Sequence, residues 1–292
     1  MKPLLSWGTR TFVMGILNIT PDSFSGDGML AGPDPVTAAL ERARQFAREG
    51  ADILDVGGES TRPGSHVISA EEELARVLPV ARVLAQAGLT TPGGQRLLLS
   101  IDTYKAKVAE VVLDAGFDWV NDVWGLRADA AMAGVVARFG AGLVLMDNRS
   151  RPENVDFQNH LGGRYTGDAY THLVDEVKAG LMDGVSLARM AGVKDEQIIL
   201  DPGIGFGKTV EQNLELIDRL GALRELNFPI LLGPSRKGFI GFTLNLPRDE
   251  RIEGTTAAVA VGIARGADII RVHDVCVMTR VARMTDAIVR RV

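Results

Sequence analysis

Eight short runs of apolar and often β-branched residues recur along the chain, and each is followed by a stretch with helical spacing. The runs cover residues 12–17, 53–56, 97–101, 119–120, 143–146, 198–200, 230–232 and 269–272. Strands that are apolar on both faces and separated by helices are typical of a parallel sheet buried on both sides. Eight such units predict an α/β fold of the closed (β/α)8 TIM barrel type, in a single domain over residues 1–292.

Helix signals lie between these runs. Residues 35–49 place apolar side chains at helical spacing, and Gly50 follows as a stop signal. Ser69, with Glu72 three residues later, has the pattern of a capping box at the start of the next helix.

The last predicted helix begins near residue 275 and has one apolar face. Its members are Val277, Val281, Met284 and Ile288. We expect this stripe to pack against the barrel, as such a stripe does on most amphipathic helices. The alternative is that it contributes to an interface between subunits.

A polar or charged residue stands at or just past the end of each apolar run. These residues are Asn18, Asp55, Asp102, Asn121, Asp147, Asp201, Ser235 and His273. Active sites of such barrels lie at the carboxyl ends of the strands, so these side chains form the candidate active site. Residues 18–33 and 57–65, rich in glycine or serine, are expected to be loops that cover a ligand on this face. Residues 147–167 are expected to form a third long loop.

Charge and composition narrow the function. The formal net charge of -5 gives no general attraction to nucleic acid or to an anionic membrane, so an anionic ligand needs a local cationic cluster. We expect no membrane span and no signal peptide, because no apolar stretch is long enough and the first residues lack the pattern. The single cysteine, Cys276, cannot form an internal disulfide and fits a reducing compartment. A cytoplasmic protein is expected.

A cationic cluster is predicted at the ends of the last two strands. Residues two apart on a strand face the same side, so Arg271 and His273 project together and Val272 turns away. Residues 235–237, Ser-Arg-Lys, add a hydroxyl and two cations beside them. Barrels commonly bind phosphate here, so the cluster indicates a phosphorylated ligand. The alternative is that Arg236 or Arg271 forms a salt bridge to a neighbouring helix.

Carboxylates make a second group. Asp55, Asp102 and Asp201 stand at three strand ends and Asn121 at a fourth, with no matching excess of cations expected in the same mouth. Buried carboxylates need partners, and a pterin, whose 2-amino and N3–H edge resembles a guanidinium, presents the N–H donors that satisfy them. Two alternatives remain open. The three aspartates could bind a metal such as Mg2+, or Asp201, which precedes Pro-Gly, could cap a turn.

Seven segments together resemble the dihydropteroate synthases. They are residues 14–25 (MGILNITPDSFS), 55–64 (DVGGESTRPG), 100–103 (SIDT), 121–123 (NDV), 201–208 (DPGIGFGK), 235–237 (SRK) and 271–274 (RVHD). The resemblance runs nearly end to end, in the right order, and each motif lies at a predicted strand end. It implies a transferase of folate biosynthesis, a sulfonamide target and a homodimer. The family condenses 6-hydroxymethyl-7,8-dihydropterin diphosphate with p-aminobenzoate, giving 7,8-dihydropteroate and diphosphate.

The resemblance also implies a role for each matching residue. The pterin would be held by Asp102, Asn121, Asp201 and Lys237. The diphosphate would be held by Asn18, Arg271 and His273, with Mg2+ at Asn18 and with Asp55 in support. The p-aminobenzoate pocket would consist of Phe24, Thr61, Arg62, Pro63, Phe206 and Ser235 once the first two loops close. The catalytic set would be Asp102, Lys237, Arg271 and His273.

The chemistry agrees with this inventory. Diphosphate leaves readily when cations neutralise its developing charge. The cation left on the pterin methylene is stabilised by Asp102, and the arylamine is already nucleophilic. No strong general base is therefore needed, and no Ser-His-Asp or Cys-His arrangement is expected.

Two departures from the family pattern leave roles open. Asp147 stands in Met-Asp-Asn where the family often has Met-His-Met, and Asp27 is shifted by one position in the first loop. The competing functions are a pterin-binding methyltransferase that acts with a corrinoid partner and a catalytically idle paralogue that binds pterin. The methyltransferase would have no need for a diphosphate site, so the cationic cluster favours the synthase.

Overall fold

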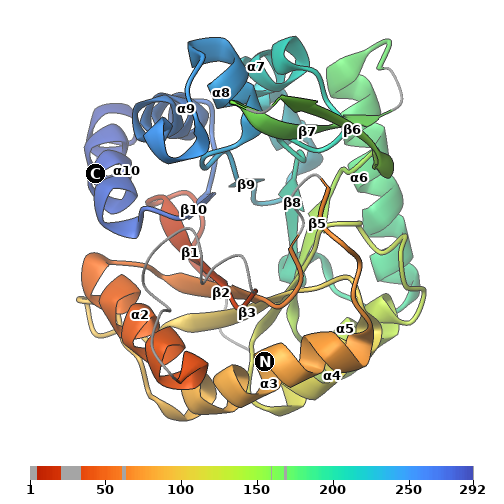
Figure 1. The fold of residues 1–292 in the computed structure, drawn as a ribbon, viewed down its shortest axis with the longest axis vertical. Helices are drawn as coiled ribbons and strands as arrows, with labels where there is room; N and C mark the ends of the chain where they lie inside the picture. Colours follow the sequence, from red (N-terminus) through yellow and green to blue (C-terminus); the bar gives the residue numbers. More distant parts are fainter. Residues whose placement is uncertain (1–4, 21–33, 61–63, 159, 168–169, 292) are drawn as a thin grey trace.

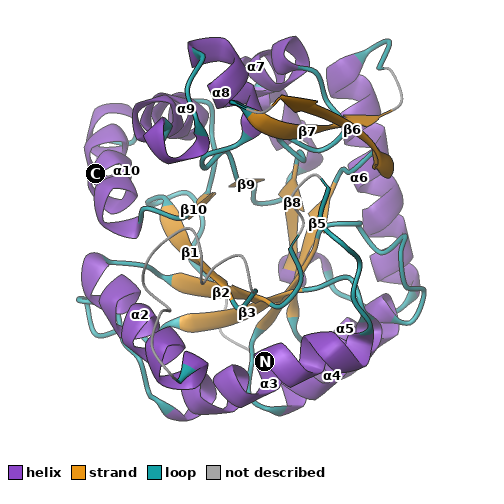
Figure 2. Ribbon diagram, in the orientation of Figure 1, coloured by secondary structure: helices purple, strands orange, loops and turns teal. Residues whose placement is uncertain are grey.

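The computed structural model describes residues 5–20, 34–60, 64–158, 160–167 and 170–291. Eight of its strands run parallel in a ring that helices surround on the outside (Figures 1 and 2). The ring strands are β1 (Phe12–Asn18), β2 (Ile53–Gly57), β3 (Leu98–Asp102), β4 (Trp119–Asp122), β5 (Gly142–Met146), β8 (Ile198–Asp201), β9 (Leu231–Leu232) and β10 (Ile269–Val272). The predicted (β/α)8 barrel is confirmed.

The helices that cover the ring follow the strands in sequence. They are α2 (Pro35–Glu49), α3 (Ala70–Gln86), α4 (Ala106–Asp114), α5 (Met132–Phe139), α6 (Leu173–Met190), α7 (Val210–Asp218), α8 (Gly238–Leu244), α9 (Ile252–Ala264) and α10 (Val275–Val289). The stop at Gly50 is confirmed, and of the capping box predicted at Ser69 the structure shows the Ser69 half. The Ser69 side chain accepts a hydrogen bond from the Glu72 amide, and Gly50 ends α2 in the left-handed conformation, at φ 97°.

The ring closes between β8 and β9. The strand order around the sheet is β8-β5-β4-β3-β2-β1-β10-β9, and a parallel bridge joins Leu200 to Ile230. The Leu200 amide also donates to the Pro229 carbonyl at 2.9 Å. Closure brings all eight carboxyl ends to one rim, although the strands are far apart in sequence.

Side chains along each strand point alternately to the outside and the inside of the barrel, which produces two separate hydrophobic cores. Side chains on the outer face pack against the helices, whereas a smaller cluster fills the amino-terminal half of the barrel interior. Its members are Phe12, Met14, Ile53, Leu98, Trp119, Val144, Ile199, Leu231 and Ile269. Successive side chains on a strand point to opposite faces. The next side chains to face the barrel interior are therefore two and four residues after each member of this cluster.

Those later inward positions are mostly polar. They include Asn18 on β1, Asp55 on β2, Asp102 on β3, Asn121 on β4, Asp201 on β8 and Arg271 on β10. Strand register places Asp102 opposite Asn121, and Met14 opposite Arg271. The barrel interior is therefore apolar at its amino-terminal end and polar at its carboxyl-terminal end.

The expectation of an irregular third loop is wrong. Strands β6 (Ser150–Gln158) and β7 (Gly162–Gly167) form an antiparallel hairpin outside the ring. Figure 1 shows this hairpin near α7 and α8, at the rim of the barrel. The side chain of Arg251, which precedes α9, donates to the Leu161 carbonyl at the hairpin turn, at 2.7 Å.

The predicted packing of the last helix is wrong for most of its stripe. Val277, Met284 and Ile288 are exposed, with 64% of Met284 and 62% of Ile288 accessible. The buried face of α10 consists of Val275, Met278, Thr279, Ala282, Thr285 and Asp286. The packed face is thus built of smaller and partly polar residues. Asp286 accepts hydrogen bonds from the Thr11 amide and hydroxyl at 2.7 and 2.8 Å.

In the part of the chain that the structure describes, no helix combines the length and the hydropathy needed to cross a membrane.

Candidate active site

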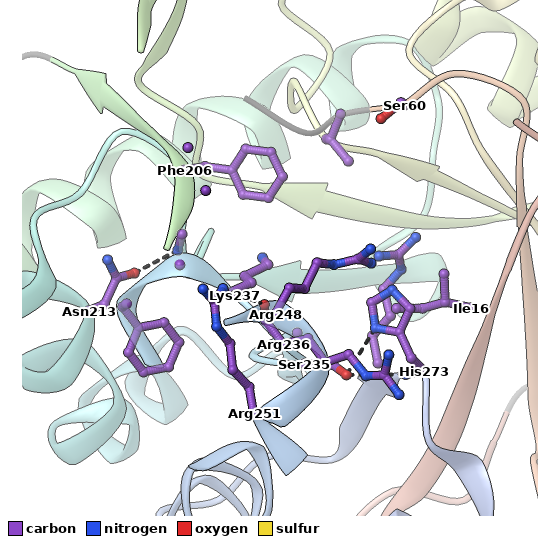
Figure 3. A pocket seen from close by; sticks show the side chains of 18 of the residues that line it. Ile16, Ser60, Phe206, Asn213, Ser235, Arg236, Lys237, Arg248, Arg251 and His273 are labelled. Atoms are coloured by element: carbon purple, nitrogen blue, oxygen red, sulfur yellow. Dashed lines mark hydrogen bonds between the residues drawn. The ribbon is translucent and has the colours of Figure 1, made fainter. Parts of the chain in front are cut away.

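A cavity of about 480 Å³ opens at the carboxyl ends of the strands (Figure 3). Its wall includes residues from most strand ends and from the hairpin. Among those predicted for the site, it contains Asn18, Asp102, Asn121, Asp201, Phe206, Ser235, Lys237, Arg271 and His273. The structure therefore brings six of the eight strand-end residues selected from the sequence into one cavity wall, whereas Asp55 and Asp147 lie outside that wall.

Arg271 lies at the centre of a buried ion-pair network. Its guanidinium donates to Asp55 from Nε and to Asp102 from Nη2, both at 2.6 Å. Asn121 donates to the same Asp55 oxygen at 2.9 Å. The expectation that these carboxylates lack a matching cation is wrong, because Arg271 reaches two of them across the barrel.

The network changes the acid–base properties of Asp102. Burial raises its pKa to about 7, against the opposing attraction of Arg271. The neighbouring carboxylates, Asp55 first, raise it further, and they raise the pKa of Arg271 as well. Asp102 is therefore placed to change its charge near neutral pH.

Asp201 and Lys237 form the second charged group in the cavity. Asp201 Oδ2 and Lys237 Nζ both lie 4.0 Å from where a Cβ on Gly233 would stand. Burial raises the pKa of Asp201 and lowers that of Lys237 to about 7, while each group's charge counteracts the shift of the other. Lys237 Nζ also lies 4.5 Å from the centre of the Phe206 ring and donates to the Ile204 carbonyl.

The turn-capping interpretation of Asp201 is confirmed, and it leaves room for a second role. Its Oδ1 accepts a hydrogen bond from the Gly203 amide at 2.7 Å, which is the turn-capping contact. Its side chain also lines the cavity. One carboxylate oxygen therefore fixes the turn and the other is available for a ligand.

Ser235 and His273 stand side by side at the cavity wall. Their Oγ and Nδ1 atoms are 3.0 Å apart, and the bond is drawn as a dashed line in Figure 3. Val272 is buried, so Arg271 and His273 face the cavity together as predicted. Together they place a guanidinium and an imidazole at the cavity wall beside a hydroxyl.

Arg236 confirms the alternative of a salt bridge. Its guanidinium makes two hydrogen bonds to Asp274 at the start of α10, at 2.9 and 2.6 Å. Its backbone has φ 56°, a left-handed conformation that is costly for an arginine. The Arg251 guanidinium donates to the Arg236 carbonyl at 3.1 Å, and the Arg236 amide donates to Thr255 at 3.0 Å. These contacts hold a strained turn between Ser235 and Lys237.

Asn18 is the residue expected to bind Mg2+. A Cβ on Gly57 would lie 3.4 Å from Asn18 Oδ1 and 3.7 Å from Asp102 Oδ2, so the two oxygens border the same small space. No group of three His, Cys, Asp or Glu side chains that could hold a metal is found among the described residues. Mg2+ is often bound by one or two protein oxygens together with substrate phosphates and water. This donor set fits such a shared site.

Side chains not selected from the sequence support the second loop where it leaves β2. Lys105 donates to Glu59 and, at 2.6 Å, to the buried Glu73. The Tyr104 hydroxyl donates to Glu59 at 2.9 Å. Tyr104 and Lys105 directly follow Asp102-Thr103, which is the one sequence signal that could have indicated them. Glu59 lines the cavity, so this cluster supports its wall.

Several predicted residues cannot be placed. Phe24, Thr61, Arg62 and Pro63 of the predicted p-aminobenzoate pocket, and Asp27, lie outside the described residues. The described part of that pocket consists of Phe206 and Ser235, both in the cavity wall.

Comparisons with known proteins agree with this geometry. A family model described as pterin binding enzyme matches residues 14–273. The dihydropteroate synthase of Clostridium beijerinckii is 47% identical over 285 residues, covering 97% of this chain and 96% of the relative. That of Bacillus subtilis is 43% identical and covers 98% and 92%, respectively.

Solved structures show the same similarity. The dihydropteroate synthase from Clostridium difficile in the presence of pteroic acid superposes with a TM-score of 0.86 at 43% identity, covering 98% of this chain and all of the other. The Xanthomonas albilineans enzyme with 4-aminobenzoic acid gives 0.83 at 36% identity, covering 99% and 98%. The chain therefore belongs to the pterin-binding enzyme family and, within it, to the dihydropteroate synthases.

Proposed function

We propose that the chain condenses 6-hydroxymethyl-7,8-dihydropterin diphosphate with p-aminobenzoate to 7,8-dihydropteroate and diphosphate, a step of folate synthesis. The residues of this cavity bind the substrates and stabilise the charges that develop. The observation that carries the assignment is that one cavity holds both a carboxylate–lysine pair and an arginine–histidine pair. The first is Asp201 with Lys237, and the second is Arg271 with His273.

The pterin binds at the carboxylates. Asp201 accepts hydrogen bonds from the 2-amino and N3–H edge through the oxygen that the Gly203 amide leaves available. Asn121 and Lys237 serve the remaining polar atoms of the ring, while Asp102 faces the reacting side. Asp55 supports the site by holding Arg271 and Asn121.

The diphosphate binds at the opposite group. Arg271 supplies positive charge, Arg271 and His273 supply hydrogen-bond donors, and Asn18 would hold Mg2+ through its amide oxygen. When bound, Mg2+ neutralises charge that develops on the leaving diphosphate. Arg271 is held by two aspartates before any ligand arrives, so its guanidinium is already positioned for that charge.

The arylamine binds against Phe206 and Ser235, and we retain Phe24, Thr61, Arg62 and Pro63 as its further contacts. Loss of diphosphate leaves positive charge on the pterin methylene, which the Asp102 carboxylate stabilises. The arylamine nitrogen then attacks that carbon, the C–O bond to diphosphate having broken, and the new C–N bond forms with loss of one amine proton.

A coupled assay tests this function. The purified protein should form dihydropteroate from the pterin diphosphate and p-aminobenzoate in the presence of Mg2+, and a sulfonamide should compete with p-aminobenzoate. Methyl transfer from methyltetrahydrofolate to a corrinoid protein, without synthase activity, would instead support the methyltransferase. Pterin binding without either activity would identify an idle paralogue.

The charge state of Asp102 predicts the pH dependence of pterin binding. The ionised Asp102 carboxylate accepts ligand N–H groups, so its contribution makes the affinity for 6-hydroxymethylpterin rise with pH below its pKa of about 7. Lys237 has the opposite effect, because it donates as an ammonium and its pKa is also about 7. Affinity in the wild type should therefore pass through a maximum near pH 7 and fall roughly tenfold per pH unit well away from it on either side.

Calorimetry on the wild type and on Asp102→Asn separates the two groups. The variant should lose the rise in affinity and retain only the Lys237 trend, in which affinity falls as pH increases. An unchanged rise in Asp102→Asn would show that another group controls the binding.

We also propose that the protein is a homodimer formed through α9 and α10. These helices lie side by side at one edge of the barrel in Figure 1. α9 has one charged residue, Glu253, and exposes Val261, while α10 exposes Met284 and Ile288. Exposed apolar side chains that gather on adjacent elements are typical of a surface that a partner covers.

The double variant Met284→Glu/Ile288→Glu should convert the dimer to a monomer in analytical ultracentrifugation, because it places charge in an apolar interface. Met190→Glu on α6 is the matched control, since Met190 is 85% exposed on another helix. A monomeric wild type, or a dimer that survives the double substitution, would contradict the proposal.

A cytoplasmic location is the remaining part of the proposal. Its support is the cysteine content, because a chain with the single cysteine Cys276 does not rely on internal disulfides.

A further inference from the structure

Two side chains of opposite charge lie completely buried beside the cavity, and no role described above uses them. Asp147 follows β5, and Lys208 ends the segment 201–208 that follows β8. Their Oδ2 and Nζ atoms are 3.1 Å apart, and both side chains are 0% exposed. Asp147 is also the position at which the sequence departs from the family pattern.

Lys208 holds its own loop together. Its ammonium donates to the carbonyl oxygens of Gly203 at 3.3 Å and Phe206 at 3.4 Å. It also donates to the Asp147 carbonyl at 3.3 Å. A single buried cation thus joins the two turns of segment 201–208 to the end of β5.

Segment 201–208 packs tightly against the end of β5. Gly203 has φ 72°, and a Cβ there would lie only 1.8 Å from the Asp147 carbonyl oxygen. The Asp147 amide donates to the Asp201 carbonyl at 3.0 Å, which continues the strand pairing into the loop. A small movement at Asp147 must therefore displace the loop.

The carboxylate of Asp147 is fixed from a second direction. The Tyr170 hydroxyl donates to its Oδ2 at 2.9 Å, whereas its Oδ1 has no hydrogen-bond partner among the described residues. Burial lowers the pKa of Lys208, and the negative charge of Asp147 is the largest influence that counteracts this shift. Lys208 depends on Asp147 to remain an ammonium at this depth.

We propose that Asp147 and Lys208 are positioning residues that set the place of Phe206 and Asp201 in the cavity. The inference rests on the proposed function, since Phe206 forms a wall of the arylamine site and Asp201 accepts the pterin. The Phe206 carbonyl is bound directly by Lys208, whereas Asp201 is also anchored in β8 and by the Gly203 amide. Arylamine binding therefore depends on the pair more than pterin binding does.

The variants Asp147→Asn and Lys208→Met test this role by steady-state kinetics. In each, KM for p-aminobenzoate should rise about tenfold, a loss of the order that small displacements of positioning groups produce. The dissociation constant for 6-hydroxymethylpterin, measured by calorimetry, should rise less, and kcat should change least. The double variant should be no worse than the more affected single variant, because residues that act as one unit are not additive.

Asp286→Asn is the matched control. Asp286 is another buried aspartate with side-chain and backbone partners, and it binds Thr11 at the amino-terminal end of the barrel, opposite the cavity. It should lower the melting temperature without changing KM for either substrate. If Asp147→Asn behaves in the same way, the pair is only structural and the proposal is overturned.

Two further outcomes are decisive. If Asp147→Asn does not fold, Tyr170→Phe removes one hydrogen bond to the same carboxylate oxygen and keeps the charge pair. This variant should raise KM for p-aminobenzoate by a smaller factor, and an unchanged KM would overturn the proposal. A wild type without synthase activity would refute the proposed function instead, so the two failures are distinguishable.

Discussion

Replacing Arg271 with alanine is expected to remove most of the synthase activity. The guanidinium is positioned before ligands bind, and loss of one such preorganised electrostatic group typically costs about 2.7–4 kcal/mol of transition-state stabilisation. This corresponds to a fall in kcat/KM of about 10²- to 10³-fold. The variant also leaves Asp55 and Asp102 without their cation, and breaking a buried pair costs about 3–5 kcal/mol of folding stability.

The measurement is kcat/KM at saturating Mg2+, together with thermal unfolding and diphosphate binding by calorimetry. Arg271→Lys keeps the positive charge but cannot bind Asp55 and Asp102 with two separate N–H groups of a guanidinium. Compared with Arg271→Ala, it should therefore restore folding stability more than it restores kcat/KM. Arg10→Gln is the control for the loss of an arginine. Arg10 binds Asp52 with two hydrogen bonds at the amino-terminal end of the barrel. Near-normal kcat/KM in Arg271→Ala would contradict the diphosphate assignment.

The barrel could be predicted because each of its strands is recognisable from a short stretch of sequence. Each strand is a short apolar run, and the runs found in the sequence agree with all eight ring strands within a few residues. The hairpin of β6 and β7 could not be predicted in this way. Its first strand, SRPENVDFQ, contains a proline and charged residues, and its only large apolar residues are Val155 and Phe157. It pairs only with β7 and adds nothing to the barrel core.

The face of α10 was misjudged for a related reason. The helical spacing of apolar residues identifies an apolar face, but it does not identify the surface against which that face packs. Val277, Met284 and Ile288 follow helical spacing, yet the barrel contacts the side of α10 that carries Met278 and Ala282. Small side chains allow a helix to lie close to the sheet, so the packed face is less hydrophobic in appearance than the exposed one.

The site was predictable in its members but not in its pairings. The rule that barrel sites lie at strand carboxyl ends selects Asp102, Asp201 and Arg271 without any structure. Which of them touch depends on strand register and closure, so the contact of Arg271 with Asp102 across the barrel has no signal in the sequence. The same holds for Asp147 and Lys208, which are 61 residues apart in the chain.

Replacing Asp201 with asparagine is expected to abolish tight pterin binding while the fold survives. The Gly203 amide needs an acceptor at the Oδ1 position, so the asparagine oxygen takes that place and its NH2 group occupies the position of Oδ2. A donor then faces the N–H donors of the pterin. Hydrogen bonds to a charged group contribute about 1.5–3 kcal/mol each, so the loss of two should weaken binding by at least about 100-fold.

Calorimetry with 6-hydroxymethylpterin measures this loss, and thermal unfolding reports the fold. Asp268→Asn provides the comparison, because Asp268 is also buried and accepts a hydrogen bond from a backbone amide, that of Ile230, at 2.9 Å. It lies just before β10, at the amino-terminal end of the barrel, and should leave pterin affinity unchanged. Normal pterin binding by Asp201→Asn would refute its role as the pterin acceptor. An unfolded Asp201→Asn would show that the fold itself requires the negative charge of this carboxylate beside Lys237.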